Sequence, residues 1–144
     1  MTVFDPLRRK DVAATPEERV RQWFIGFMRD SMNVPAHMMM SEVGFRYGGK
    51  RYRADVLVYG RSGRPLAVVE CKRPDVAIDA SVAEQAMRYN AVLSVKYIFL
   101  TNGAKTYAFR REEGVFKSVP TMPLWDEMVG AESGPCSPDE TSPV

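Results

Sequence analysis

Residues 65–74 constrain the fold of this chain more than any other segment. Four aliphatic residues lead directly into Glu70 and Lys72, with one residue between the two charges. The aliphatic run predicts a buried strand, and Pro74 ends it because proline cannot donate to a sheet ladder. Alternate side chains of a strand share a face, so Glu70 and Lys72 project together while Cys71 points the other way. A carboxylate and an ammonium therefore lie at the end of a buried strand, where charge is costly.

The preceding segment, residues 53–59, is a second apolar run with Asp55 near its start. A turn-like stretch separates the two runs, which predicts neighbouring strands. Two carboxylates and a lysine on adjoining strands suit a magnesium-dependent phosphodiesterase, because Mg²⁺ prefers oxygen ligands and the amine lies near the attacking water. The pattern therefore predicts a nuclease. The ordinary alternative is a surface ion pair between Glu70 and Lys72, with or without Asp55, which contributes little to stability.

A first helix is predicted from residue 15 to residue 30. Thr15 is a good N-cap, Pro16 fits the first helical position, and Glu18 completes a capping box. At 100° per residue, Glu17 lies within about 50° of the apolar face and Glu18 about 150° away. Glu17 therefore borders the interior, although the sequence leaves open which glutamate reaches the site. The apolar face has three- and four-residue spacing: Val20, Trp23, Phe24, Phe27 and Met28.

The remaining pattern predicts a mixed α/β domain. Helix, three strands, helix and two strands follow in that order, which requires a mixed sheet with helices packed on it. Residues 1–14 resemble a leader whose basic run at 8–10 is solvated, and residues 130–144 are expected to be a disordered acidic, proline-rich tail. Between these ends, the predicted segments are strands at 40–47, 52–59 and 65–72, a helix at 79–93, strands at 96–101 and 105–109 joined at Asn102-Gly103, and a closing helix at 120–129.

Composition limits the function classes. The chain has 144 residues, 45% hydrophobic and 26% charged, which is typical of one soluble globular domain. It has no membrane-spanning run and no signal-peptide hydrophobic region, so we expect a cytoplasmic protein without a membrane partner. Residues 1–129 carry 20 basic and 15 acidic side chains, which permits contact with phosphates without requiring it. Two cysteines in unlike contexts and a single histidine argue against a zinc site or a histidine triad.

Five ordered pieces of the chain resemble the PD-(D/E)xK nuclease superfamily and, most closely, the amino-terminal nuclease domain of type I restriction enzyme R subunits. An E-x-K motif alone is weak, but five pieces at family-like spacing are more specific. The resemblance implies a restriction-endonuclease-like three-layer core, with a mixed central sheet flanked by helices, in one domain over residues 15–129. The five pieces lie at residues 15–22, 53–55, 69–72, 85–89 and 101–103.

The resemblance also implies a ligand set and a reaction. Asp55 and Glu70 would hold Mg²⁺, for which Mn²⁺ is expected to substitute, and the Cys71 backbone carbonyl would be a further ligand. Glu17 would bind the ion through water or bind a second ion. Lys72 would orient the water-derived nucleophile and stabilise charge on the phosphorane. The expected reaction is in-line hydrolysis of a DNA phosphodiester that leaves a 5′-phosphate.

Gln85 and Tyr89 are four residues apart and therefore adjacent on the second predicted helix. The resemblance implies that Gln85 belongs to the site or contacts the nucleic-acid backbone; alternatively, it is a buried amide that bonds a loop carbonyl. Tyr89 is expected in the core with its hydroxyl at the rim. Arg53 shares a strand face with Asp55, where it contacts a bound phosphate or only screens the carboxylates. We expect the other nearby cations to be solvated loop charges: Lys50, Arg51 and Arg73.

The implied partners are DNA and other restriction-system subunits. The chain lacks a phosphate-binding P-loop, so it contains no ATP-driven motor, and a helicase or translocase would be a separate partner. The sequence also leaves undecided whether the domain forms a homodimer, because relatives often need two sites to cut both strands. Two other functions stay open as well. One is a catalytically silent nucleic-acid-binding or assembly module on the same fold, and the other is a structural domain with a surface ion pair.

Overall fold

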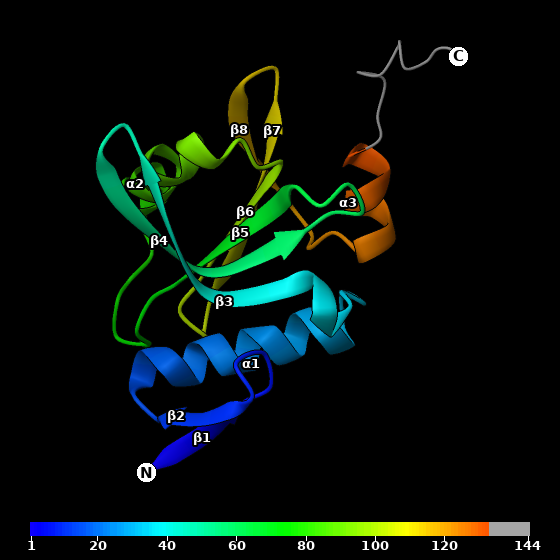
Figure 1. The fold of residues 1–144 in the computed structure, drawn as a ribbon. Coiled ribbons are helices and arrows are strands. Elements are labelled where there is room, and N and C mark those ends of the chain that lie inside the picture. The colour runs from blue at the N-terminus through cyan, green and yellow to red at the C-terminus, as the bar shows by residue number, and fades with distance from the viewer. Residues whose placement is uncertain (133–144) are drawn as a thin grey trace.

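The computed structural model describes residues 1–132. Residues 133–144 of the predicted tail therefore lie outside the described residues. The chain forms a mixed α/β domain, which confirms the predicted fold class (Figure 1). In chain order its elements are β1 (Thr2–Asp5), β2 (Lys10–Ala13), α1 (Pro16–Asp30), η1 (Ala36–Met38), β3 (Met39–Tyr47), β4 (Lys50–Tyr59), β5 (Pro65–Cys71), α2 (Ala80–Asn90), η2 (Ala91–Leu93), β6 (Tyr97–Thr101), β7 (Thr106–Glu112), β8 (Val115–Val119) and α3 (Trp125–Glu132).

Six strands form the central sheet in the order β3-β4-β5-β6-β7-β8. Only β5 and β6 pair in parallel within it, and α2 makes the crossover between them. A parallel pair needs such a crossover, whereas its antiparallel neighbours are joined by short turns. The central strand β5, which carries Glu70, is therefore held on both sides.

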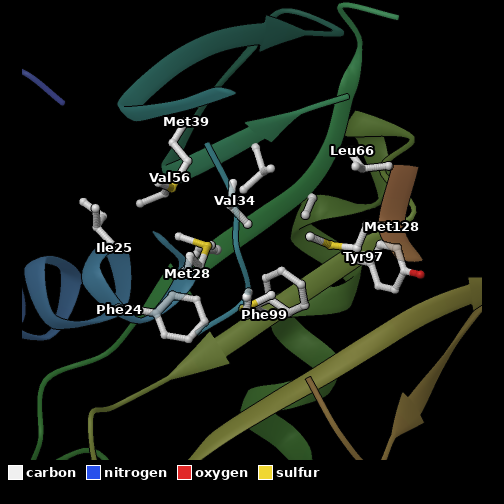
Figure 2. Close-up of a cluster of buried hydrophobic side chains, with 14 of the residues drawn as sticks. Phe24, Ile25, Met28, Val34, Met39, Val56, Leu66, Tyr97, Phe99 and Met128 are labelled. Carbon is white, nitrogen blue, oxygen red and sulfur yellow. The ribbon is translucent and has the colours of Figure 1, made fainter. Parts of the chain in front are cut away.

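Helices cover both faces of the sheet. α1 and α3 pack on one face, where one buried cluster includes Phe24, Met28, Phe99 and Met128 (Figure 2). α2 covers the other face over a second cluster that includes Ala86. The β1–β2 hairpin lies on the outer side of α1 (Figure 1). Among residues 1–132, no helix has both the length and the apolarity that a bilayer crossing requires.

Helix α1 begins as the sequence predicts, but its buried face is rotated. The Thr15 hydroxyl accepts a hydrogen bond from the Glu18 backbone N–H at 3.1 Å, which is half of the predicted capping box. Trp23 was placed on the apolar face, yet 47% of it is exposed. Ile25 and Arg21 are buried instead. The buried face of α1 differs from the predicted one because Arg21 pairs with Glu18 and Glu42 inside the fold.

A separate two-stranded sheet and one strand of the central sheet are absent from the sequence-based prediction. Residues 1–14, expected as a leader, form the β1–β2 hairpin, and β8 extends the sheet beyond β7. The turn before β8 has two residues with positive φ, Glu113 and Gly114, the conformation of a tight hairpin. The Asn102-Gly103 connection is longer than a two-residue turn, because β7 begins at Thr106. The closing helix α3 begins later than predicted, at Trp125.

The core between α1 and the sheet supplies a direct test of this packing. Phe24 is fully buried, and its ring centroid lies 6.2 Å from that of Phe99. Phe24→Ala should lower the free energy of unfolding by about 3–5 kcal/mol, because it leaves a cavity. Phe4→Ala is the matched control, since 59% of Phe4 is exposed. Denaturant unfolding measures both variants, and equal losses would contradict this packing.

Candidate active site

The candidate site lies where β4 and β5 separate. Their pairing ends at Val56 with Val69, and the same register continued would set Asp55 opposite Glu70. Instead, Asp55 Oδ2 accepts a hydrogen bond from the Cys71 backbone N–H at 2.7 Å. A side-chain oxygen thus satisfies a backbone donor that would otherwise lack a partner at the opening. The two strands stay connected while a space forms between them.

Glu70 points into this space with Lys72. Lys72 Nζ lies 2.7 Å from Glu70 Oε2, as strand alternation predicts for residues two apart. Glu70 Oε1 accepts a hydrogen bond from Asn90 Nδ2 at 3.3 Å, and the same amide donates to the Ala86 carbonyl at 2.9 Å. The Cys71 side chain points the other way and is buried in the core. Helix α2 therefore fixes one oxygen of Glu70, and Lys72 fixes the other.

These groups line one pocket of about 440 Å³. Glu17 reaches it from α1, Arg53 from β4 and Tyr89 from α2, so together with β5, which carries Glu70, four elements build the pocket. The remaining lining residues are Ala54, Val69, Cys71, Arg73, Val76 and Asn90. Asp55, Glu70 and Lys72 thus converge with Glu17, although Glu17 lies far from the other three in the sequence.

The electrostatic environment of Asp55 is unusual for an aspartate. Burial raises the pKa of Asp55 above its ordinary value, and the negative charges of Glu17 and Glu70 raise it further. The Cys71 N–H and the positive charge of Arg21 oppose this rise without cancelling it. Within residues 1–132, Asp55 forms no ion pair. The pocket therefore holds a partly buried carboxylate that lacks a bonded cation.

The donor set suits one class of metal ion. Among the described residues, no three or more His, Cys, Asp or Glu side chains form a group that could hold a metal ion. Two carboxylates and a backbone carbonyl do suit Mg²⁺, which usually binds one or two protein carboxylates and keeps water or phosphate as its other ligands. They do not suit structural zinc, which takes four sulfur or nitrogen ligands. The residues present therefore fit magnesium or manganese.

Comparison with known protein families identifies the family of this chain. Residues 16–123 match the profile of the family described as "Type I restriction enzyme R protein N terminus". The chain belongs to this family. No curated protein matched in a separate sequence search.

Two solved structures resemble this chain, and the first shows the same fold. One is described as "The fragment structure of a putative HsdR subunit of a type I restriction enzyme from Vibrio vulnificus YJ016", with a TM-score of 0.61 and 22% identity. That match covers 81% of this chain but only 25% of the other, so this chain spans a quarter of that fragment. A second, described as "a putative nuclease belonging to DUF820 from Anabaena variabilis ATCC 29413", has a TM-score of 0.49 and 11% identity, with 84% of each chain covered.

The structure of this R-protein N-terminal domain does not bring Gln85 into the acidic pocket. Gln85 is exposed and lines an adjoining hollow with Tyr52 and Tyr89, so it is not the buried amide of the alternative interpretation either. Asn90 provides the amide that reaches Glu70. Sequence analysis missed Asn90, although its position one turn after the buried Ala86 was a usable signal. The Tyr89 hydroxyl lies at the rim, where it accepts from the Arg53 backbone N–H at 3.2 Å.

Behind the pocket, Glu18 belongs to a buried ionic network. Sequence analysis had it as a capping acid that points away from the core, but it is buried and pairs with Arg8 at 3.0 Å and Arg21 at 3.4 Å. Arg8, expected to be solvated, also pairs with the fully buried Asp5 and with Glu42. The opposite charges in the β1–β2 turn and α1 explain both corrections. Glu17 is thus the glutamate of α1 that faces the pocket.

The network continues to the strand beside Asp55. Arg21 Nη1 lies 3.0 Å from Glu42 Oε2, and Glu42 adopts a left-handed conformation with φ of 52°. The β3–β4 pairing omits Glu42 and Asp55, although the pairs on either side keep one register. The irregular backbone turns the Glu42 carboxylate towards Arg21. This leaves Asp55 facing the pocket.

The raised pKa of Asp55 gives a stability prediction. In chelator at neutral pH, Asp55→Asn should raise the melting temperature, because it removes a buried, repelled charge and keeps an acceptor for Cys71. The gain should vanish as the pH falls below the ordinary value of 3.8, where Asp55 is protonated in both folded and unfolded chains. Thermal melts across pH measure this difference. A variant that is less stable at neutral pH would contradict it.

The ionic network gives a second prediction. Arg8→Ala leaves Asp5 buried without its cation and leaves Glu18 with Arg21 alone, so it should lower the free energy of unfolding by about 3 kcal/mol. Lys10→Ala, in the adjacent strand β2 and exposed, is the matched control and should change stability by less than about 0.5 kcal/mol. Urea unfolding compares the two. Similar small effects would show that the network does not stabilise the fold.

Proposed function

We propose that this domain is a metal-dependent DNA endonuclease that hydrolyses phosphodiester bonds in a restriction system. The observation that carries the proposal is the convergence of Asp55, Glu70 and Lys72 in one pocket, where Asp55 has no cation bonded to it from residues 1–132. Membership in the R-protein N-terminal family and the nuclease-like fold support it. A phosphodiester is an anion, so a divalent ion would join it to the carboxylates.

Each residue has a distinct role in this proposal. Asp55, Glu70 and the Cys71 carbonyl would hold Mg²⁺ or Mn²⁺, with Glu17 as a ligand through water. The ion would act as a Lewis acid and would lower the pKa of a bound water molecule. Lys72 would release Glu70 and stabilise negative charge on the phosphate, because its Nζ already lies in the pocket. Asn90 would keep Glu70 oriented.

The proposed partners follow from the family. DNA would be the substrate, and helicase, translocase or other restriction-system subunits would deliver it. One pocket cuts one strand, so a homodimer or a partner subunit would complete a double-strand break.

One observation favours a second candidate, a catalytically silent nucleic-acid-binding or assembly module. Both oxygens of Glu70 already have protein partners, and no complete ligand cage exists among the described residues. In such a module the Glu70–Lys72 pair would be structural. DNA binding that persists in chelator, with no cleavage product under any metal, would favour this candidate.

A cleavage assay tests the proposal. Supercoiled DNA with Mg²⁺ or Mn²⁺ should be nicked or cut by the wild type, and Lys72→Ala and Asp55→Ala should each reduce the rate by at least ~100-fold. Lys117→Ala is the matched control, because Lys117 is exposed on β8 at the far edge of the sheet. Equal rates in the wild type and the two pocket variants would refute the assignment of the site.

A further inference from the structure

The β3–β4 hairpin is strongly basic. Residues 43–54 carry four cationic side chains and no acidic one. The hairpin projects past the rest of the sheet beside α2 (Figure 1). Its cations are Arg46, Lys50, Arg51 and Arg53. Sequence analysis treated two of them as solvated loop charges, but all four lie in paired strands.

One face of the hairpin is aromatic and packs on α2. Phe45 pairs with Tyr52 across the strands, and their rings stack with centroids 5.3 Å apart. The Tyr52 ring contacts the Tyr89 ring of α2 at 4.8 Å. Lys50 Nζ lies over the Tyr52 ring, 5.7 Å from its centroid. These contacts hold the hairpin against α2 and decide which face stays free.

The opposite face is lined by arginines. Strand alternation directs Arg51 and Arg53 away from Tyr52, and Arg46 pairs directly with Arg51 across the strands. We call Arg46, Arg51 and Arg53 the arginine face. Like charges directly opposite each other destabilise a sheet, so this arrangement has a cost in the isolated domain.

The arginine face lacks the acidic partners that other arginines of the chain have. In the described part of the chain, Arg46 and Arg51 are exposed and form no ion pair. Arg53 is 63% exposed and only approaches Glu42, at 3.8 Å. Arg8 and Arg21, by contrast, each pair with two or more acids. A polyanion would neutralise the arginine face.

This face is continuous with the acidic pocket. A second hollow of about 580 Å³ runs along the hairpin, and all three arginines line it together with Phe45, Tyr52 and Tyr89. Arg53 and Tyr89 line both this hollow and the pocket of Asp55. Asp55 follows Arg53 by two residues on β4, so the arginines lead along the strand to the proposed site of cleavage.

We infer that the arginine face binds the phosphate backbone of the DNA strand that enters the acidic pocket. This inference rests on the proposed function for the choice of DNA. The contacts are charge-assisted bonds from guanidinium groups to phosphate oxygens, and they are independent of base sequence. The hairpin therefore sets the direction from which the substrate reaches Asp55.

The test compares Arg46→Ala/Arg51→Ala with Arg61→Ala/Arg64→Ala. The control removes the same charge from the turn at the opposite end of β4. Binding of a labelled duplex is measured in EDTA over a range of salt concentrations. The hairpin variant should bind at least ~10-fold more weakly, and its slope of log affinity against log salt should fall in magnitude by about 1.8, which corresponds to two lost phosphate contacts. The control should keep the wild-type slope.

A third variant separates charge from folding. Arg46→Lys/Arg51→Lys keeps both positive charges, so it should keep the salt slope even if affinity falls slightly. Equal losses in the hairpin and control variants, or an unchanged slope in the hairpin variant, overturn the inference. So does preferential binding of an acidic protein with no DNA affinity. If the wild type and the hairpin variant cleave DNA at equal rates and bind it with equal affinity, the arginine face is rejected and the endonuclease proposal stands. If the wild type binds DNA with the expected salt dependence but does not cleave it, the arginine face stands and the endonuclease proposal is rejected.

Discussion

The hydrogen bond from the Cys71 backbone N–H to the Asp55 carboxylate is the contact on which the candidate site depends. It lies one step beyond the last paired residues of β4 and β5. Normal pairing there would place backbone against backbone and close the space. The side-chain acceptor keeps the donor satisfied while the strands separate, and Glu70 then points into the opening with Lys72. The fold thus accepts a partly buried carboxylate with a raised pKa, and a bound cation would offset its cost.

Charges around this opening are arranged in two layers. Behind it, the Asp5, Glu18 and Glu42 carboxylates are paired with Arg8 and Arg21 inside the fold. In front of it, and among the residues that the structure describes, Asp55 and the arginine face of the β3–β4 hairpin lack bonded partners of opposite charge, apart from the distant approach of Arg53 to Glu42. Paired groups stabilise the structure, whereas unpaired groups of both signs at one surface suit a ligand that contains both a divalent cation and a polyanion. DNA with its metal ion is such a ligand.

Local patterns predicted the parts of this structure that local geometry controls. Strand alternation placed Glu70 and Lys72 on one face, and the helical angle placed Glu17 at the border of the interior, where the structure has it lining the pocket. Long-range contacts decide the rest. Glu18 is buried because Arg8 reaches it from the β1–β2 turn, and a short strand pair without clear periodicity gave no signal for that hairpin. β8 was missed for the same reason, since tertiary pairing with β7 stabilises a short, mostly exposed strand. The family resemblance implied a site role for Gln85, whereas Asn90 is the amide of α2 that reaches Glu70.

The most direct test of the site is a crystal structure of the domain soaked with Mn²⁺, with the ion located by its anomalous signal. We predict one ion within about 2.0–2.3 Å of oxygens from both Asp55 and Glu70, with Lys72 Nζ displaced from its present 2.7 Å contact with Glu70. The contradicting result is a pocket without an anomalous peak at saturating Mn²⁺, in which the Glu70–Lys72 pair is unchanged.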